Sequence, residues 1–399
     1  MEQTILAQLA RQVATPGYIF DADLFRDRTK LVRRAFGEKV GLCFSIKANP
    51  FLLKYLPEEF DKIEVCSPGE LSVCERIGAD LSKIIFSGVN KTKQDVERAI
   101  DDGVNVLTVE SDLHLNLIHD AAKARNTVVP VLLRLTAGSQ FGMDRQDVLR
   151  IITNRESYPH IKIVGIHFFS GTQKRKAAAI IKELDKLLAF FEEVEQLGFH
   201  LQRLEYGTGL AVDYFASNAD EVERERLDAI SEKIREVGEK TELTVEMGRF
   251  FAAPCGYYVT KVMDTKTCEN IHYAIVDGGL NQLKYDGQIQ GMQIPVITQV
   301  PEKSDAETQP WTLCGSLCTT ADILARNAML QGLQIGDTLV FHRTGAYSVS
   351  EGMALFLSRE LPEVNVYSAE TGLQQLRPLM DASRFNTPCD MDLFGRVLL

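Results

Sequence analysis

A lysine at the end of an apolar run is the first residue of this sequence that could do chemistry. Lys47 lies near the end of the stretch GLCFSIKANP, residues 41–50, and is followed closely by Asn49 and Pro50. An ammonium group is costly to bury without a partner, so a lysine where a buried strand stops either reaches solvent or takes part in a reaction.

Polar residues follow several other short apolar runs in the first 250 residues. The run ELTVEMGR carries Glu246 and Arg249, and the glycines of YGTG and EMGR would let backbone amide groups approach an anion closely. An amine, a carboxylate and an anion-binding loop together suit pyridoxal phosphate, which a lysine binds as a Schiff base while an acid keeps the pyridine nitrogen protonated. The polar residues and glycines at these run ends are Ser67, Glu70, Arg134, His167, Thr172, Gly207, Gly209, Glu246 and Arg249, with Phe169 beside them.

Each of these residues has an ordinary explanation when it is taken singly. Lys47 could be a surface lysine, Glu246 could pair only with Arg249, and the GTG triplet could be a plain turn. Barrel enzymes place their catalytic groups at the C-terminal ends of successive strands. The joint placement of these residues therefore favours the cofactor interpretation.

The order of the apolar runs predicts an α/β barrel over residues 25–250. Short β-rich runs alternate there with amphipathic helical stretches such as PGELSVCERIGA and TKQDVERAIDDG. Such a series of βα units is what a (β/α)8 TIM barrel requires, and a doubly wound sheet is the competing interpretation. The predicted strands are KVGLCFSI, KIEVCS, KIIFSG, VNVLTVES, VVPVLLRL, IKIVGIHFFSG, LQRLEYGTG and ELTVEMG.

After residue 250 the pattern changes to strand-like runs with few helices between them. Residues 251–399 are therefore predicted to form a separate β domain, a β-sandwich or barrel-like fold. The extended stretch TPGYIFDAD near the start of the chain is expected to add a strand to it, so residues 1–24 are assigned to the same domain. The predicted strands are GYYVTKVMDTKT, IHYAIVDGG, IPVITQVPE, TQPWTLCGS, GDTLVFHRTGAY and VNVYSAE.

The overall charge and the cysteine pattern narrow the class of protein. A net charge of −11 over 399 residues argues against nucleic acid, or an anionic membrane surface, as the main partner. No apolar run reaches the roughly 18 residues that a membrane span needs, and the N-terminal stretch has the pattern of a short amphipathic helix rather than a signal peptide. Eight scattered cysteines favour free thiols in a reducing cytoplasm. Cys314 and Cys318 have C-x3-C spacing without a second ligand pair, so no metal site is predicted.

Taken in order, these motifs resemble those of the fold-type III pyridoxal-phosphate decarboxylases, the family of diaminopimelate and ornithine decarboxylases. The resemblance covers the chain almost end to end. It implies a pyridoxal 5'-phosphate cofactor, an alanine racemase-like fold and decarboxylation of an amino acid. The corresponding segments are FSIKANP, EVCSPGEL with its acidic residues Glu64 and Glu70, GIHFFSGTQ, EMGRFFAAPCG, SLCTTADIL and GAYSVS.

The resemblance also implies roles for individual residues. Lys47 is the lysine that binds the cofactor, and Cys318 is the candidate proton donor, in a segment that a neighbouring subunit inserts into the site. A homodimer with shared active sites is therefore expected. The expected cofactor contacts are Lys47, His167, Phe169, Thr172, Gly207, Thr208, Gly209, Glu246, Gly248, Arg249 and Tyr347, and the expected substrate contacts are Arg249, Thr319 and Asp322.

Three positions depart from the family pattern around the cofactor. Phe169 stands where the family has its ring-stacking histidine, and His167 lies two residues earlier, on the same face of a strand. We expect Phe169 to stack on the ring, with a contribution of His167 from below as the alternative. Thr208 interrupts the glycine triplet, and Met247 replaces a proline.

Two further departures concern the substrate. Thr319 follows the cysteine where diaminopimelate decarboxylases carry a glutamate for the distal amino group, and the segment 277–297 lacks the arginine and tyrosine that they use for the distal carboxylate. Loss of both anchors argues against a doubly charged distal end. The segment is more similar to a specialised-metabolism branch that includes decarboxylases of glutamyl groups tethered to a carrier protein.

The resemblance leaves several alternatives open. Diaminopimelate decarboxylase of lysine biosynthesis is the alternative substrate assignment, and an amino-acid racemase would share the cofactor and both domains. A regulatory protein that lost catalysis is disfavoured because Lys47, Glu246, Cys318 and Tyr347 are all present. A barrel aldolase that uses Lys47 without a cofactor would leave the β domain unexplained.

Overall fold

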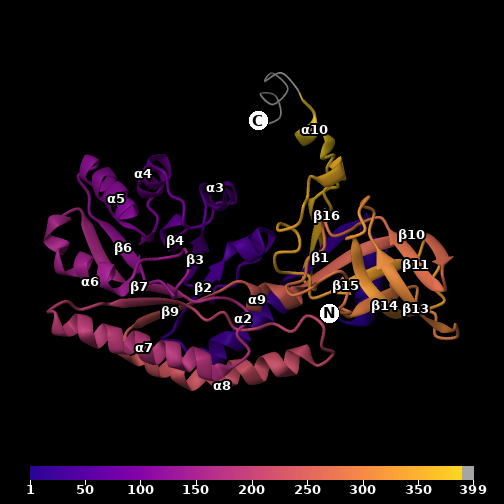
Figure 1. Ribbon diagram of the computed structural model, residues 1–399, viewed down its shortest axis with the longest axis horizontal. Coiled ribbons are helices and arrows are strands. Elements are labelled where there is room, and N and C mark those ends of the chain that lie inside the picture. Colours follow the sequence, from indigo (N-terminus) through magenta and orange to yellow (C-terminus); the bar gives the residue numbers. More distant parts are fainter. Residues whose placement is uncertain (389–399) are drawn as a thin grey trace. The chain divides into compact units, whose positions relative to one another are not determined.

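The computed structural model describes residues 1–388, which form two compact units (Figure 1). One unit comprises Phe25–Asp213 and Asn218–Ala252. The other comprises Met1–Leu24, Tyr214–Ser217 and the chain from Ala253 onward. Residues 389–399, the end of the predicted β domain, lie outside the described residues.

The first unit is a closed barrel of parallel strands in sequence order, and β9 pairs with β2 to close it. This confirms the predicted (β/α)8 barrel, and closure excludes the doubly wound alternative because an open sheet has two edges. The strands are β2 (Gly41–Ser45), β3 (Lys62–Val65), β4 (Ile84–Phe86), β5 (Val106–Val109), β6 (Val129–Arg134), β7 (Ile161–Phe169), β8 (Arg203–Gly207) and β9 (Glu242–Met247).

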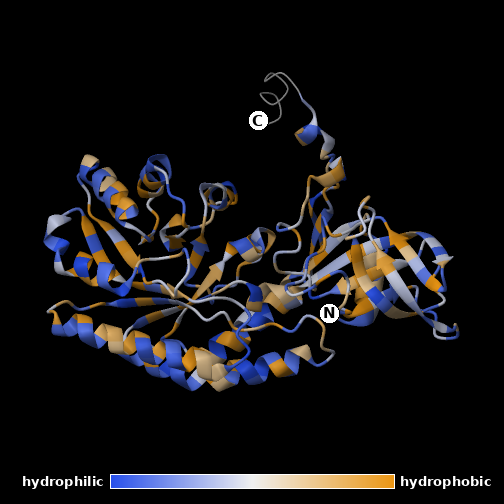
Figure 2. Ribbon diagram, viewed as in Figure 1, coloured by the Kyte–Doolittle hydropathy of each residue, from blue (hydrophilic) through white to orange (hydrophobic). Residues whose placement is uncertain are grey.

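Amphipathic helices follow the strands and cover the barrel (Figure 1). The buried residues of α7 recur every three or four positions, at Ile180, Leu184, Leu187 and Phe190, so that one stripe of the helix is apolar. Figure 2 shows hydrophobic and hydrophilic residues mixed along α7 and α8, as this periodicity requires. The helices are α2 (Ala22–Phe36), α3 (Pro68–Arg76), α4 (Lys93–Asp101), α5 (Asp112–Ala124), α6 (Arg145–Thr153), α7 (Ala177–Gln196), α8 (Ala219–Lys240) and α9 (Arg249–Ala252).

The barrel interior is apolar in one layer and acidic in others. Cys43, Ile85, Val106, Leu132 and Val164 form a buried cluster contributed by five strands. The strands β3, β8 and β9 instead carry the buried acids Glu64, Glu205 and Glu246. Carboxyl groups in a barrel core need partners, so they mark the part of the barrel where chemistry is expected.

The second unit is a separate mixed β sheet, and β1 (Gly17–Asp21) belongs to it as predicted. The strand β1 pairs antiparallel with β10 and parallel with β16. The helix α1 (Gln3–Ala10) buries Leu6 and Leu9 in a cluster with Ile19 and Tyr257. The remaining strands are β10 (Gly256–Cys268), β11 (Ile271–Val276), β12 (Ile297–Val300), β13 (Thr308–Cys314), β14 (Ile323–Gln331), β15 (Thr338–His342), β16 (Glu363–Ser368) and β17 (Gly372–Arg377).

Two strands of this sheet, β14 and β17, were not expected from the sequence. Their segments ILARNAMLQ and GLQQLR are poor in β-branched and aromatic residues, and contain alanine, leucine, methionine and glutamine that favour helices. Pairing of β14 with β13, and of β17 with β16, overrides that local preference. Within residues 1–388, no helix has the length and apolar content of a membrane span.

A buried ion pair between α2 and α8 provides a test of barrel stability. Arg28 pairs with Glu223, and their side chains are 5% and 0% exposed. Arg28→Met should lower the free energy of unfolding by about 3–5 kcal/mol, because Glu223 is left buried without its counter-charge. Urea unfolding followed by circular dichroism measures this loss.

The exposed pair of Lys39 and Glu239 supplies the matched control. Lys39→Met should leave the unfolding midpoint nearly unchanged, because water solvates both groups when the pair is broken. Equal effects of the two substitutions would contradict a special contribution of the buried pair.

Candidate active site

Lys47 lies just beyond β2, in a single 3-10 turn formed by Ile46–Ala48. Its Nζ is 2.7 Å from Glu64 Oε2, and 3.9 Å from Glu246 Oε1. The lysine side chain is 39% exposed, whereas that of Glu64 is only 2% exposed. Lys47 is therefore not an ordinary surface lysine, because its amine is held over the acidic part of the barrel interior.

Glu64 and Cys66 form the wall beside the lysine. The thiol of Cys66 donates to Glu64 Oε1 at 3.0 Å, and Lys47 Nζ is 3.4 Å from the Cys66 sulfur. Burial, reinforced by the charge of Glu64, raises the pKa of the Cys66 thiol well above its ordinary value. The thiol thus remains a hydrogen-bond donor, and its backbone N–H is fixed by Glu70 Oε2 at 2.6 Å.

Glu246, in β9, is held by three groups from other strands and turns. His167 Nε2 lies 3.1 Å from Glu246 Oε2, the hydroxyl of Ser45 donates to Oε1 at 3.1 Å, and Lys47 lies beyond it. Glu246 thus has close partners on β2 and β7, beyond the pairing with Arg249 that was its ordinary explanation. Both His167 and Glu246 are buried, so this carboxylate has a fixed position and direction.

The pKa values of two buried acids, Glu246 and Glu205, are shifted in opposite directions. Burial by itself raises the pKa of Glu246, but the hydrogen bond with His167 and the charge of Lys47 outweigh it and hold the pKa well below its ordinary value. Burial, with the charges of Glu246 and Glu64, instead raises the pKa of Glu205 well above its ordinary value. Glu246 is therefore ionised near neutral pH, whereas the environment of Glu205 favours its protonated form.

Glycines line the ends of β7 and β8 because a Cβ at these positions would collide with neighbouring residues. A Cβ at Gly207 would lie 2.6 Å from the ring of Phe169, and one at Gly209 would lie 1.9 Å from the carbonyl oxygen of Gly171. Gly209 has a φ of +61°, in the left-handed region. The loops after β7 and β8 therefore touch through their backbones, with Thr208 buried between the two glycines.

The loop after β9 completes this end of the barrel. A Cβ at Gly248 would lie 2.7 Å from that of Ala48, so the glycine allows β9 to end against the turn that carries Lys47. Arg249 follows it, and its Nε donates to Thr172 Oγ1 at 3.3 Å. The loops after the seventh and eighth strands of the barrel, β8 and β9, thus meet the loop after β7.

A second group of buried charges lies at the ends of β4, β5 and β6. Arg134 Nη1 is 3.1 Å from Glu110 Oε1, and Lys91 Nζ donates to Thr108 Oγ1 at 3.1 Å. Burial lowers the pKa of Lys91 to about 8. Arg134 was singled out in the sequence by its place at a strand end, but Lys91 and Glu110 were not, although Glu110 directly follows β5.

The remaining predicted residues belong to the other unit. Cys318 and Thr319 are exposed in the turn between β13 and β14. Asp322 is buried there, and its oxygens accept the backbone N–H groups of Leu280 at 2.7 Å and Leu317 at 2.8 Å. Tyr347 has a φ of +66°, and its carbonyl oxygen accepts N–H groups from residues 350 and 351.

Sequence patterns missed the partners that surround the lysine. Ser45, Cys66 and Glu205 were not predicted site residues, and Glu64 was noted only as an acidic position. A usable signal was present in the sequence: Glu64 and Glu205 stand among apolar residues in strands that should be wholly apolar.

Comparison with known proteins identifies the family. Residues 22–253 match the model of the pyridoxal-dependent decarboxylases, pyridoxal binding domain. A diaminopimelate decarboxylase of Vibrio cholerae is 30% identical, over 94% of this chain and 93% of that protein. The L-glutamyl-[BtrI acyl-carrier protein] decarboxylase of Niallia circulans is 26% identical, over 91% of each.

A solved structure supports the same fold. The diaminopimelate decarboxylase of Helicobacter pylori, complexed with L-lysine, has a TM-score of 0.83 at 23% identity and covers 96% of this chain and 99% of that one. The chain belongs to the pyridoxal-dependent decarboxylases. It is a carboxy-lyase, and its cofactor is pyridoxal 5'-phosphate.

The described residues fit this cofactor. The Nδ1 atom of His167 is buried without a hydrogen-bond partner within residues 1–388, beside the ionised Glu246. The amine of Lys47 faces the same carboxylate. Loops at Gly207 and Gly209 have no room for a Cβ and present backbone at the barrel end where phosphate sites recur.

The depressed pKa of Glu246 predicts a pH-dependent contribution to stability. A carboxylate whose folded pKa is lowered stabilises the protein above its ordinary pKa of 4.5, and this contribution is lost as the pH falls toward the folded pKa. Glu246→Gln should therefore lower the free energy of unfolding of the apoprotein by about 3 kcal/mol near neutral pH. The deficit should shrink below pH ~4. Urea unfolding across pH measures it.

Ser45→Ala is the control, because it removes a neutral hydrogen bond to the same carboxylate. Ser45→Ala should lower the free energy of unfolding by a smaller amount, and this loss should not shrink at acidic pH. A Glu246→Gln deficit that is constant from neutral to acidic pH would show that Glu246 is not held ionised by its neighbours.

Proposed function

We propose that this decarboxylase acts on an amino acid whose distal end lacks the charged pair of diaminopimelate, and that an acidic aminoacyl group tethered to a carrier protein is its substrate. The observation that carries the proposal is the chemistry of segment 277–297. Its sole cation is Lys284, which is 3.1 Å from Glu351, and the hydroxyl of its buried Tyr285 donates to the carbonyl oxygen of His342. Lys284 thus has a carboxylate partner already, and the hydroxyl of Tyr285 is used within the protein.

The position after Cys318 supports the same conclusion. Thr319 has no charge, and its hydroxyl oxygen accepts the backbone N–H of Ala321 at 3.3 Å. A distal ammonium group would lack a carboxylate at this position. The relative from Niallia circulans is named for a glutamyl group on a carrier protein.

Diaminopimelate is the second candidate substrate. The Vibrio cholerae relative and most others of similar identity are named diaminopimelate decarboxylases. Identities of 23–30% leave room for a change of substrate while the cofactor site is kept. We favour the tethered substrate because the residues that would bind the distal end of the substrate differ in charge from those expected in diaminopimelate decarboxylases.

Residues of the barrel would bind and orient the reacting groups. Bound pyridoxal phosphate supplies an electron sink for the electron pair left on the α-carbon when CO2 departs. Lys47 would hold the cofactor covalently. Glu64, with the Cys66 thiol, would orient the lysine amine, and the Glu64 carboxylate would balance its positive charge. Gly207, Thr208 and Gly209 would present backbone to the phosphate, with Gly248, Arg249, Thr172 and Tyr347 as further cofactor contacts.

Glu246 would keep the pyridine nitrogen protonated. An ionised carboxylate fixed by Ser45 and His167 can accept that N–H without rearranging. His167 would act through Glu246 and through its second ring nitrogen, while Phe169, on the same face of β7, would stack on the ring. His167 and Phe169, which the sequence offered as alternatives, would thus both contribute to cofactor binding.

Cys318 would return a proton to the α-carbon after CO2 departs, with Lys47 as the other candidate donor. Cys318 is exposed, as a residue offered to a substrate from another subunit would be. Asp322 would hold its loop through the N–H of Leu317, in addition to the predicted substrate contact. We propose a homodimer with shared active sites, located in the cytoplasm, where thiols such as Cys318 stay reduced.

A substrate panel tests the assignment. Purified enzyme is given free diaminopimelate, free lysine, ornithine and glutamate, and glutamyl groups on carrier proteins, and CO2 release is measured. We expect kcat/KM for a carrier-bound group to exceed that for diaminopimelate by at least about 100-fold. Lys47→Ala should release no CO2 from any substrate.

The same panel separates the alternatives. Faster turnover of diaminopimelate than of every carrier-bound group would exclude the tethered substrate, and a product that keeps its α-carboxylate would identify a racemase. Thr319→Glu is the matched variant. It should improve turnover of diaminopimelate relative to wild type, because it adds a carboxylate for the distal ammonium group.

Mixing inactive variants tests the shared sites. Lys47→Ala and Cys318→Ala homodimers should each lose about 100-fold or more of the activity. After subunit exchange half of the dimers are hybrids, each with one intact site of two, so about a quarter of wild-type activity should return. No recovery, when mass spectrometry shows that hybrids have formed, would mean that each site is built from one chain.

A further inference from the structure

The carboxylate of Glu183 joins three residues that adjoin the proposed phosphate cradle, the loops at Gly207–Gly209. Its Oε1 accepts the hydroxyl of Ser170 at 2.6 Å. Its Oε2 accepts Nζ of Lys174 at 2.6 Å and the hydroxyl of Tyr206 at 2.7 Å. A helix residue that gathers two hydroxyls and an ammonium group from two other segments holds those segments in one arrangement.

Each of the three partners is one step from the cradle. Ser170 directly follows the last residue of β7, and Tyr206 directly precedes Gly207 in β8. The backbone of Lys174 is bonded to the cradle loop itself: its N–H donates to Gly209 O at 2.8 Å, and its carbonyl oxygen accepts the N–H of Ala211 at 3.1 Å. A shift of these partners would therefore move the cradle.

The cradle has little tolerance for such a shift. Gly209 approaches Gly171 so closely that a Cβ would be 1.9 Å from its carbonyl oxygen. The side chain of Gln173 also spans the two loops, accepting the N–H of Val212 at 2.8 Å and donating to Val212 O at 3.2 Å. Backbone amides bind an anion well only when their positions are fixed beforehand.

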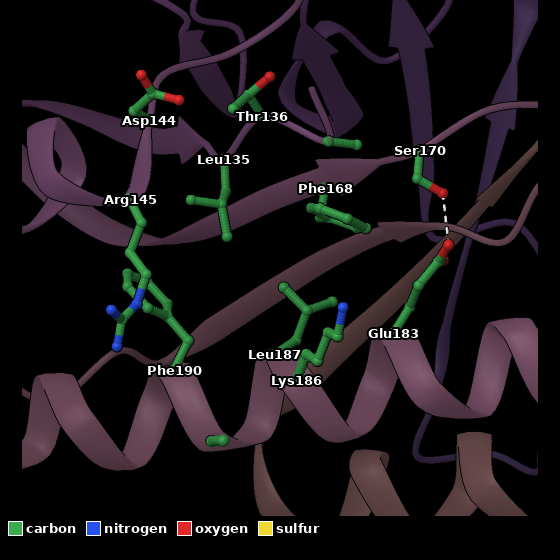
Figure 3. Close-up of a pocket in the computed structure, with 12 residues that line it drawn as sticks. Leu135, Thr136, Asp144, Arg145, Phe168, Ser170, Glu183, Lys186, Leu187 and Phe190 are labelled. Carbon is green, nitrogen blue, oxygen red and sulfur yellow. Dashed lines mark hydrogen bonds between the residues drawn. The ribbon is translucent and has the colours of Figure 1, made fainter. Parts of the chain in front are cut away.

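Glu183 acts from outside the barrel. The Ser170–Glu183 hydrogen bond lies at one end of a cavity of about 650 Å³ between α7 and the ends of β6 and β7 (Figure 3). Phe168 lines this cavity, and its ring stacks with that of Tyr206 at 6.4 Å. Side chains alternate along a strand, so Phe168 and Tyr206 point away from the interior that His167 and Glu205 face.

The hydrogen-bonding groups are in the correct protonation state for this task. Burial, followed by the charge and the hydrogen bond of Glu183, raises the pKa of Tyr206 far above its ordinary value. Tyr206 is thus a permanent donor. Lys174 is 12% exposed and Glu183 is 20% exposed, so the ion pair is shielded from water more than the surface pairs are.

We propose that Glu183 is a positioning residue that sets the affinity of the cradle for the phosphate of the cofactor without contacting the cofactor. The inference rests on the proposed place of the phosphate at Gly207–Gly209. It separates two contributions to cofactor binding: the ring is held by the Glu246 side of the barrel, and the phosphate by loops that depend on Glu183.

The test compares ligands with and without phosphate on full-length apoprotein. Pyridoxamine 5'-phosphate and pyridoxamine both lack the aldehyde, so neither is linked covalently to Lys47, and their Kd ratio reports the phosphate contribution. Titrations are followed by protein fluorescence. In Glu183→Gln we expect the Kd for pyridoxamine 5'-phosphate to rise about tenfold, with that for pyridoxamine changed less than about twofold.

Glu193→Gln is the matched control, since Glu193 is an acid of the same helix that pairs with Arg145 instead. It should leave both Kd values unchanged. Tyr206→Phe removes one of the three hydrogen bonds and should shift the Kd ratio in the same direction by a smaller factor. Tyr206→Phe therefore tests the positioning role of Glu183 even if Glu183→Gln does not fold.

The outcomes distinguish this inference from the proposed function. A wild-type protein that binds both ligands equally would mean that the cradle is not the phosphate site. A Kd ratio that is unchanged from wild type in Glu183→Gln, or in Tyr206→Phe, would overturn the positioning role. Equal weakening of both ligands would assign Glu183 a general structural role, and would overturn the proposal as well.

Discussion

The ion pair between Lys47 and Glu64 is the constraint around which the barrel end is built. An ammonium group placed over a core that holds Glu64, Glu205 and Glu246 must find a counter-charge, and Glu64 Oε2 supplies it at 2.7 Å. The same positive charge helps to hold the pKa of Glu246 below its ordinary value, whereas burial and the charges of Glu246 and Glu64 raise the pKa of Glu205. The pKa values of these two buried acids are thereby shifted in opposite directions.

The loops after β7, β8 and β9, at the same end of the barrel, depend on close contacts at glycines. Glycines at 207, 209 and 248 allow the ends of β7, β8 and β9 to approach closely, because a Cβ at any of these three positions would collide with a neighbouring residue. Glu183 fixes this arrangement from the outer side of the barrel through Ser170, Lys174 and Tyr206. The residues proposed for acid–base chemistry and those proposed for anion binding thus form separate sets.

Most residues proposed to contact the cofactor lie in the barrel, whereas those proposed to contact the distal end of the substrate lie in the other unit. The residues around Lys47 and Glu246 are proposed to serve the cofactor, which pyridoxal-dependent decarboxylases share. The residues proposed to meet the distal end of the substrate, Thr319 and the segment 277–297, belong to the other unit and to loops. Loops tolerate substitution because few packing contacts restrict them. A change of substrate therefore needs no change in the barrel.

The sequence by itself determined the barrel, the β domain and the lysine, because strand and helix periodicity are local and Lys47 ends an apolar run. It did not determine β14 or β17, whose helix-favouring residues become strands only through pairing with β13 and β16. Nor did it show that Glu64, Cys66 and Ser45 surround Lys47 and Glu246, or that Glu183 joins β7 to β8. Closure of the barrel decided these contacts, because it brings together strand ends that are 17 to 201 residues apart in the chain.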